Sequence, residues 1–327
     1  MRIPPTYKLT PPILEYIARI ESFRLYLSSI PIPAEIGERI QRISLLKSSL
    51  FSARIEGNTL LLEDLESTTQ KEKKQEVMNI FSAIKYIARE KENKKPITKK
   101  DILTLHQITL KGLQNSAGYF RKEMGAIFNE AGVAIYLSPP PSQVSFFLDR
   151  LLSYINSTDE KFPLISAFLA HLIFEKIHPF IDGNGRVGRL LIPLILSKKN
   201  YLFHINISLE EYLDSHKNDY YYYLNIGQKN PHDYLLFMLK AFYQQTEHIK
   251  QQISTESDKK EKIYLPLRQE EIYFIIKDHR MVSFDNIRRR FLNVPERTLR
   301  YDLKKLQDKK IIRKIGVTKG SWYTIKD

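Results

Sequence analysis

The feature that most constrains this chain is a dense polar stretch, residues 178–189, between two apolar segments. It runs His-Pro-Phe-Ile-Asp-Gly-Asn-Gly-Arg-Val-Gly-Arg. Residues 162–177 and 187–195 on either side place apolar side chains at helical spacing. The pattern predicts two buried helices joined by a short polar turn. Packing alone does not explain a turn with a base, a carboxylate, three glycines and two arginines, so it is the first candidate site.

Half of this turn suits the binding of an anion. Gly183 and Gly185 stand just before the second predicted helix, where backbone N–H groups can converge on phosphate oxygens. Arg186 and Arg189 lie in the first turn of that helix, three residues apart, and add positive charge. The sequence therefore predicts a phosphate cradle.

The other half of the turn suits proton transfer and metal binding. Asp182 precedes the cradle and can hold a Mg²⁺ ion that also touches the phosphates. His178 ends the first helix and is placed to take a proton from an attacking hydroxyl. A base, a metal carboxylate and a phosphate cradle together indicate phosphoryl or nucleotidyl transfer.

Several other classes of enzyme are excluded by pattern. Residues 183–188 satisfy Gly-x-Gly-x-x-Gly, but a predicted helix precedes them where a dinucleotide fold needs a strand. The chain has no P-loop motif and no His-Glu-x-x-His motif. It also has no cysteine, which excludes disulfides, thiolate metal sites and a cysteine nucleophile.

The twelve-residue stretch resembles the Fic family signature, His-x-Phe-x-[Asp/Glu]-Gly-Asn-Gly-Arg-x-x-Arg, at every defined position. The likeness covers roughly residues 100–245. It implies an enzyme that transfers AMP from ATP to a Ser, Thr or Tyr hydroxyl of a protein and releases pyrophosphate. Removal of AMP by the same site, and transfer of another phosphate-bearing group, stay open as alternatives.

The resemblance also implies a role for each residue of the turn. His178 would be the general base, Phe180 would anchor the loop in the core, and Asp182 would bind Mg²⁺. Arg186 would contact the β-phosphate region of ATP and Arg189 its γ-phosphate. The remaining three residues would cradle the phosphates: Gly183, Asn184 and Gly185.

A β-hairpin is expected upstream, where residues 126–128 and 133–137 are β-prone runs around a glycine-containing turn. With residues 118–121 and 139–141 it resembles the Fic flap. The flap would hold the target protein in extended form by strand addition. Its expected target-binding residues are Ala126, Ile127, Phe128, Val133, Ala134 and Ile135.

A second motif lies near the N-terminus, where Ser52 to Gly57 match the self-inhibiting pattern [Ser/Thr]-x-x-x-Glu-[Gly/Asn] of the same family. Ser52 and Glu56 are one helical turn apart and share a face. Glu56 would pair with Arg189 where the γ-phosphate binds. The resemblance therefore implies an autoinhibited enzyme.

The C-terminal residues 266–327 are expected to form a winged helix-turn-helix, three helices followed by two short strands. Residues 258–327 carry +9 of the chain's +14 net charge. This basic module favours an alternative function, a DNA-binding regulator that uses the Fic core as a sensor. The residues expected to meet phosphates or base edges of the nucleic acid are Arg288, Arg297, Arg300 and Lys304.

The complete prediction is a mainly α protein with a Fic-type helical core and a β-hairpin flap. The expected divisions are an N-terminal helical region at 1–98, a catalytic core at 99–250, a linker at 251–265 and the winged helix at 266–327. Without a signal peptide or an apolar run long enough to span a bilayer, a cytoplasmic location away from membranes is expected. Homodimer formation is left open.

Overall fold

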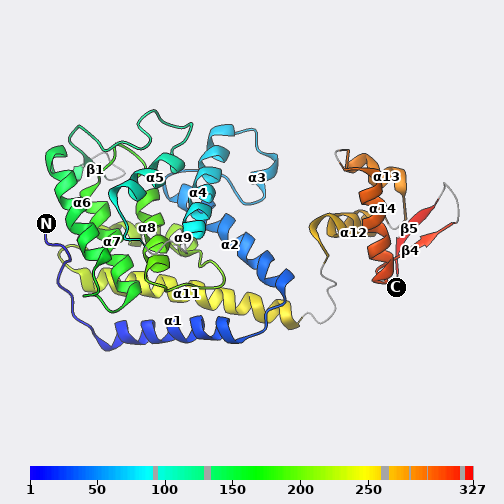
Figure 1. Cartoon of the computed structure of the whole chain (residues 1–327), viewed down its shortest axis with the longest axis horizontal. Helices are drawn as coiled ribbons and strands as arrows, with labels where there is room; N and C mark the ends of the chain where they lie inside the picture. Colours follow the sequence, from blue (N-terminus) through cyan, green and yellow to red (C-terminus); the bar gives the residue numbers. More distant parts are fainter. Residues whose placement is uncertain are drawn as a thin grey trace. The chain divides into compact units, whose positions relative to one another are not determined.

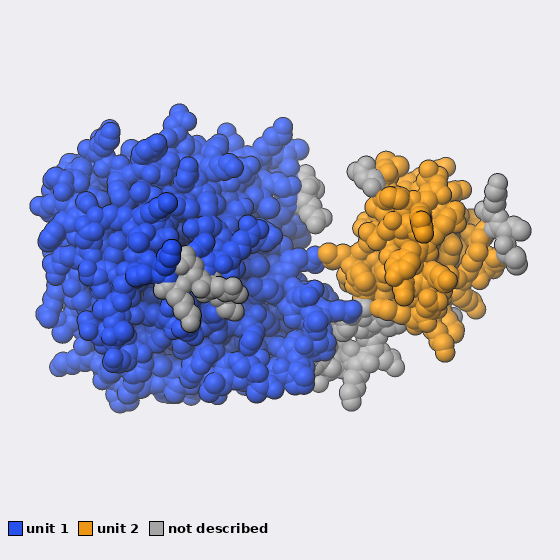
Figure 2. All heavy atoms as spheres, viewed as in Figure 1, with its two compact units in different colours: residues 1–254 blue, residues 255–327 orange. Residues whose placement is uncertain are grey.

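The computed structural model describes residues 1–90, 95–128, 134–258, 265–279, 281–292, 294–316 and 321–326. The chain divides into two compact units, residues 1–254 and residues 255–327 (Figures 1 and 2). Most described residues are helical, which confirms the predicted mainly α class. In these ranges, no helix combines the length and apolar character needed to cross a membrane.

The first unit is a set of helices around one hydrophobic core. Buried side chains of this core run from Ile3 to Phe242, so the expected N-terminal region and catalytic core fold as one body. The helices are α1 (Pro11–Ser29), α2 (Ala34–Ile55), α3 (Asp64–Ser67), α4 (Lys71–Arg89), α5 (Lys99–Thr109), α6 (Pro141–Asn156), α7 (Pro163–Ile177), α8 (Asn184–Lys198), α9 (Leu209–Ser215), α10 (Lys217–Ile226) and α11 (Pro231–Asp258). Because α11 continues to Asp258, the expected linker at 251–265 begins as helix.

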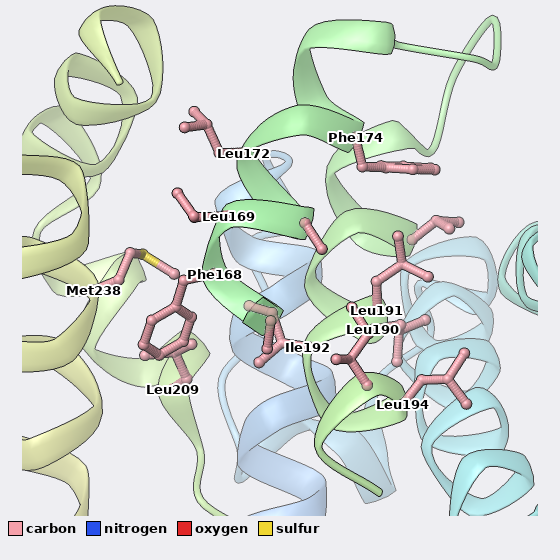
Figure 3. Close-up of a cluster of buried hydrophobic side chains, with 14 of the residues drawn as sticks. Phe168, Leu169, Leu172, Phe174, Leu190, Leu191, Ile192, Leu194, Leu209 and Met238 are labelled. Carbon is pink, nitrogen blue, oxygen red and sulfur yellow. The ribbon is translucent and has the colours of Figure 1, made fainter. Parts of the chain in front are cut away.

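Helices α7 and α8 form the centre of this core. Every residue from Leu164 to Ile177 is buried, because most side chains of α7 are apolar and other helices surround it. Side chains of α7 such as Leu169 and side chains of α8 such as Leu190 and Ile192 fill the space between the helices (Figure 3). This packing fixes the two helix ends and therefore the turn that joins them.

The hairpin consists of β1 (Ala126–Phe128) and β2 (Ala134–Leu137), paired antiparallel. Ala126 pairs with Leu137 and Ile127 with Tyr136, and the register shifts between Ile127 and Phe128. Val133, which was expected in the second strand, lies outside the described residues.

The second unit has its own hydrophobic core, which includes Ile276, Leu299 and Tyr323. Its three strands form an antiparallel sheet in the order β3-β5-β4. The elements follow one another as α12 (Leu267–His279), β3 (Val282–Ser283), α13 (Phe284–Arg290), α14 (Glu296–Asp308), β4 (Ile312–Ile315) and β5 (Trp322–Ile325).

Candidate active site

The turn between α7 and α8 is held by its own side chains. Asn184 donates to the Phe180 carbonyl oxygen at 2.9 Å and accepts from the Phe180 N–H at 2.9 Å. The Phe180 ring is fully buried and stacks on His106 of α5, with 3.6 Å between ring centroids. Because both ends of the loop are anchored in the core, its backbone is fixed before any ligand arrives.

His106 supports the same turn through two hydrogen bonds. The Gly118 N–H donates to His106 Nδ1 at 2.8 Å, so this nitrogen is unprotonated and Nε2 donates to the Asp182 carbonyl oxygen at 3.1 Å. Burial lowers the pKa of His106 to about 4, which keeps the ring neutral at pH 7. Sequence reasoning gave this histidine no role, although its four-residue spacing from Ile102 places it on the buried face of its helix.

His178 ends α7 in the left-handed region, with φ 49° and ψ 60°. This conformation, uncommon for a residue with a side chain, turns the chain sharply out of the helix. Burial lowers the pKa of His178 below its ordinary value, so its ring is neutral at pH 7. Its Nδ1 has no hydrogen-bond partner among the described residues. Because Nδ1 is buried, the neutral imidazole would accept a proton from a substrate on its other ring nitrogen.

Arg121 joins this turn to the hairpin. Its guanidinium donates to the carbonyl oxygens of His178 at 2.7 Å, Glu123 at 2.7 Å and Pro139 at 2.5 Å. The Arg121 N–H also donates to the Pro179 carbonyl oxygen at 2.9 Å. One buried cation therefore ties both ends of the hairpin to the backbone beside His178.

Asp182 stands at the start of α8, just before Gly183, which adopts φ 79°. Its Oδ1 accepts from the Gly183 N–H at 2.6 Å, and its Oδ2 accepts from Gln114 at 2.5 Å and from Arg186 at 2.9 Å. The side chain is 42% exposed, so its oxygens remain within reach of a ligand. Among the described residues there is no group of three or more acidic or histidine side chains that would hold a metal without help from a ligand.

Both arginines of the turn are held by acids from the N-terminal part of the chain. Arg186 Nη1 pairs with Glu76 of α4 at 2.5 Å. Glu76 in turn accepts from the side-chain amide of Asn58 at 2.9 Å, just after α2 ends. Sequence reasoning missed Glu76, because one acid in a helix rich in Glu and Lys carries no signal of its partner.

Arg189 is almost completely buried and is held by α2. Its Nε donates to Ser52 Oγ at 3.0 Å, and its Nη2 donates to the Ser52 carbonyl oxygen at 2.8 Å and to Glu56 Oε1 at 2.9 Å. A β-carbon on Gly185 would lie only 2.3 Å from Glu56 Oε1. The Glu56 carboxylate therefore rests directly on the backbone of the expected phosphate cradle.

The structure thus brings the predicted base, cradle, metal carboxylate and inhibitory residues into one place. The side chains of the expected flap residues Ala126, Ile127, Phe128, Ala134 and Ile135 are not described.

The four basic residues predicted for nucleic acid all lie in the second unit, where they have different partners. Arg288 and Arg300 both pair with Glu296, and the guanidinium of Arg300 lies 3.9 Å above the Phe284 ring. Arg297 and Lys304 are exposed on α14. Two of the four cations are therefore already partly neutralised within the unit.

Comparison with known families identifies the turn and its surroundings. Residues 96–196 match the model of the Fic/DOC family. This segment is a Fic domain. Two curated proteins that match this chain are named protein adenylyltransferase Fic: one from Drosophila willistoni, 30% identical over 197 residues, and one from Drosophila virilis, 32% identical over 162 residues. These matches cover 57% and 46% of this chain but only 38% and 32% of the relatives.

Solved structures with a Fic domain share the fold. A Fic family protein from Desulfovibrio desulfuricans G20 matches with a TM-score of 0.71 at 23% identity, covering 98% of both chains. Fic-1 from C. elegans matches with a TM-score of 0.61 at 21% identity, covering 75% of this chain and 73% of the other. The likeness to the first protein extends beyond the Fic domain over both units of this chain.

Proposed function

We propose that the chain is a protein adenylyltransferase that moves AMP from ATP to a Ser, Thr or Tyr hydroxyl of a target protein. The observation that carries this proposal is the placement of a neutral His178 at one end of a rigid turn and of Arg186 and Arg189 at the other. A base and two phosphate-binding cations are then fixed to one short backbone. The names of the curated relatives support the same reaction.

The reaction is a single displacement at the α-phosphorus of ATP. The target hydroxyl oxygen bonds to this phosphorus while the bond to the bridging oxygen of the β-phosphate breaks. The hydroxyl proton passes to the imidazole of His178, and pyrophosphate leaves. Backbone N–H groups at the start of α8 would receive the phosphates, and the helix dipole would favour their negative charge.

Asp182 fits the role of the Mg²⁺ ligand. Magnesium in such sites is held by one or two carboxylates and completes its shell with water and substrate phosphates, so one exposed carboxylate is sufficient. When bound, the ion would neutralise part of the negative charge of the phosphates. Arg186 and the backbone of α8 would bind the same phosphates. Arg186 must then exchange its contact with Asp182 for the nucleotide.

We further propose that α2 restrains this activity. Glu56 occupies the position on Arg189 that a terminal phosphate needs, and its carboxylate repels an approaching anion. ATP would then bind weakly or with its α-phosphate out of line. Release of α2 from Arg189 is therefore the step that permits transfer.

The test is incubation with Mg²⁺ and ATP labelled at the α-phosphate. We expect weak labelling of the wild type, stronger self-labelling of Glu56→Gly and none of His178→Ala. The double variant Glu56→Gly/His178→Ala should also be silent, which would separate loss of chemistry from restored inhibition. Equal labelling of all four proteins would overturn both the catalytic and the inhibitory assignments.

The same site is also suited to removal of AMP, with water in place of the target hydroxyl. This is tested by incubating self-labelled Glu56→Gly with wild-type protein and unlabelled ATP. Release of labelled AMP would support removal, and stable label would oppose it.

The identity of the donor nucleotide is tested by adding unlabelled GTP or CTP to the transfer assay. A different natural donor would reduce the labelling more strongly than unlabelled ATP does.

DNA binding by the second unit is the alternative function, and the exposed cations Arg297 and Lys304 on α14 favour it. The order of three helices and a final pair of strands supports the proposal of a winged helix. A gel-shift titration at several salt concentrations tests it. We expect affinity to fall steeply with salt and to drop in Arg297→Ala/Lys304→Ala, whereas absence of binding at low salt would count against it.

A further inference from the structure

Glu175 of α7 is a buried acid that packs on α8 next to Arg189 in the chain, and it belongs to a different helix from Glu56. Its side chain is 10% exposed, and its Oε1 has no hydrogen-bond partner among the described residues. The same oxygen lies against the backbone of Gly188, where a β-carbon would be only 2.1 Å away. Gly188 directly precedes Arg189, so the carboxyl group rests on the part of α8 that carries the buried cation.

The surroundings of Glu175 contain few groups that could neutralise it. His171 Nδ1 is 3.9 Å from its Oε1, but burial lowers the pKa of His171 to about 3, so this ring is uncharged. His171 Nε2 is instead 2.8 Å from the Tyr220 hydroxyl. The charged and titratable groups that act on Glu175 are Arg189, Glu56, Lys176, His171, Tyr220 and Tyr234.

Glu56 and Arg189 have opposite effects on this acid. Burial raises the pKa of Glu175 to about 8, the positive charge of Arg189 lowers it, and the negative charge of Glu56 raises it. While Glu56 is in place, Glu175 is mostly protonated at pH 7 and Arg189 has one counter-ion. Loss of Glu56 removes the repulsion and leaves the attraction, so ionisation of Glu175 becomes favourable.

A buried arginine without a counter-ion is strongly destabilising. Arg189 loses its ion-pair partner Glu56 whenever α2 releases it, and in the proposed reaction a phosphate later takes the place of Glu56. We propose that Glu175 is a reserve counter-ion for Arg189: it ionises when Glu56 withdraws, and it takes up a proton again when a nucleotide phosphate arrives. The second half of this proposal rests on the proposed function, and the first half does not.

The first half is tested by a double-mutant cycle on stability, without nucleotide. In the wild type, Glu175→Gln replaces a neutral carboxyl by a neutral amide of the same shape, so we expect the melting temperature of unit 1 to change by less than about 1 °C. In Glu56→Gly the same substitution removes a second acid that acts on Arg189, while the buried acid Glu210, on which Arg189 also acts, stays in both backgrounds. There we expect a further fall of at least about 4 °C.

Matched controls separate this effect from general damage. Asp149→Asn removes an exposed acid of α6 that pairs with Lys99 of α5 at 2.7 Å, and its effect should add to that of Glu56→Gly without coupling. Trp322, the only tryptophan, lies in unit 2. Its fluorescence transition should stay unchanged in all variants, while calorimetry follows unit 1.

The second half is tested by calorimetric titration with ATP and with AMP. Ionised Glu175 opposes the terminal phosphate of ATP, so Glu56→Gly/Glu175→Gln should bind ATP at least about threefold more tightly than Glu56→Gly. AMP lacks the terminal phosphate and should bind both variants equally. A gain for both nucleotides would point to a general change of the pocket and contradict the proposal.

The outcomes distinguish this inference from the proposed function. Additive effects of Glu56→Gly and Glu175→Gln on stability would overturn the reserve counter-ion, whatever the enzyme does. If Glu56→Gly binds no nucleotide and labels nothing, the proposed function fails while the stability cycle still decides the role of Glu175. If Glu56→Gly/Glu175→Gln binds ATP more weakly than Glu56→Gly does, the proposal that Glu175 gives up its charge to a nucleotide phosphate is wrong.

Discussion

Arg189 and Glu56 form a 2.9 Å ion pair although 133 residues separate them in the chain. The guanidinium is almost fully buried, while the carboxylate is 28% exposed. A buried cation cannot leave its site cheaply, whereas a partly exposed acid at the end of a helix can move into water. The asymmetry implies that regulation acts by moving Glu56 and α2, with Arg189 staying in place.

Ser52→Ala should release this contact only in part. The substitution removes the acceptor for Arg189 Nε but leaves the Ser52 carbonyl oxygen and Glu56 in place. Loss of one such hydrogen bond weakens the hold of α2 by about 1 kcal/mol, or roughly fivefold. Self-labelling should therefore rise to a level between wild type and Glu56→Gly. Ser82→Ala, which removes an exposed hydroxyl bonded to Met78 of α4, should leave labelling unchanged.

Asn184→Ala should loosen the turn, because the buried N–H and carbonyl of Phe180 both lose their partner. We expect unit 1 to lose about 2–4 kcal/mol of unfolding free energy, measured by urea denaturation, together with all transfer activity. Asn156→Ala is a matched control, since Asn156 makes the same pair of bonds to Ile97 far from the turn. A similar loss of stability with activity retained would show that the position of the turn, and not stability alone, supports catalysis.

The sequence predicted most of what short-range spacing controls. The twelve-residue motif located the turn, and the spacing of Ser52 and Glu56 placed both on one face of a helix, which ends at Ile55 with Glu56 as its C-cap. It did not indicate Glu76, whose partner Arg186 lies 110 residues away. Arg121 was noted only as part of the expected flap, because hydrogen bonds to backbone carbonyls leave no pattern in a sequence. Ion pairs between residues far apart in the chain, and side chains that bind several backbone carbonyls, can be recognised only in the three-dimensional structure.

The domain boundaries show the same limit. Charge and apolar periodicity separated the basic C-terminal segment from the rest, but they did not show that residues 1–98 and 99–250 share one core. Ile13, Ile20 and Leu50 from the first segment are buried in the same cluster as Phe168 and Leu191. Helical periodicity marks which face of a helix is buried and not which other helix covers it.

His106→Gln should make the stability of unit 1 less dependent on pH. In the folded protein the pKa of His106 is about 4, and in the unfolded chain it returns to roughly 6.5. Between these values the unfolded state binds more protons, so the contribution of His106 is complete above pH 6.5 and is lost as pH falls toward 4. The shift corresponds to at most about 3 kcal/mol.

The measurement is urea denaturation at pH 7.5 and pH 5. The glutamine side chain of the variant does not titrate, so the stability difference between wild type and variant should shrink at the lower pH. His248→Gln, which makes the same change of side chain at an exposed position of α11, is the control for the substitution itself. A wild-type advantage that grows on acidification would contradict the assigned ring state.

Gly188→Ala tests how tightly Glu175 packs on α8. The new β-carbon would lie 2.1 Å from Glu175 Oε1 and 3.0 Å from His171 Nδ1, so both side chains must shift within a filled core. Overpacking of this kind costs about 1–3 kcal/mol. Gly37→Ala in α2 is the control, because its β-carbon would meet only Ile32 at 3.6 Å. There the better helix former should stabilise by about 0.5–1 kcal/mol.

Glu175→Ala should act as a suppressor of Gly188→Ala. Removal of the carboxyl group frees the space that the new methyl group needs, so the double variant should be more stable than Gly188→Ala alone. The same substitution in the wild type leaves a hole in the core and should destabilise it. The effect of Glu175→Ala on the unfolding free energy would then have opposite signs in the two backgrounds. Such a reversal is expected only where the two side chains need the same space. If Glu175→Ala lowers the unfolding free energy equally in both backgrounds, the carboxyl does not rest on Gly188.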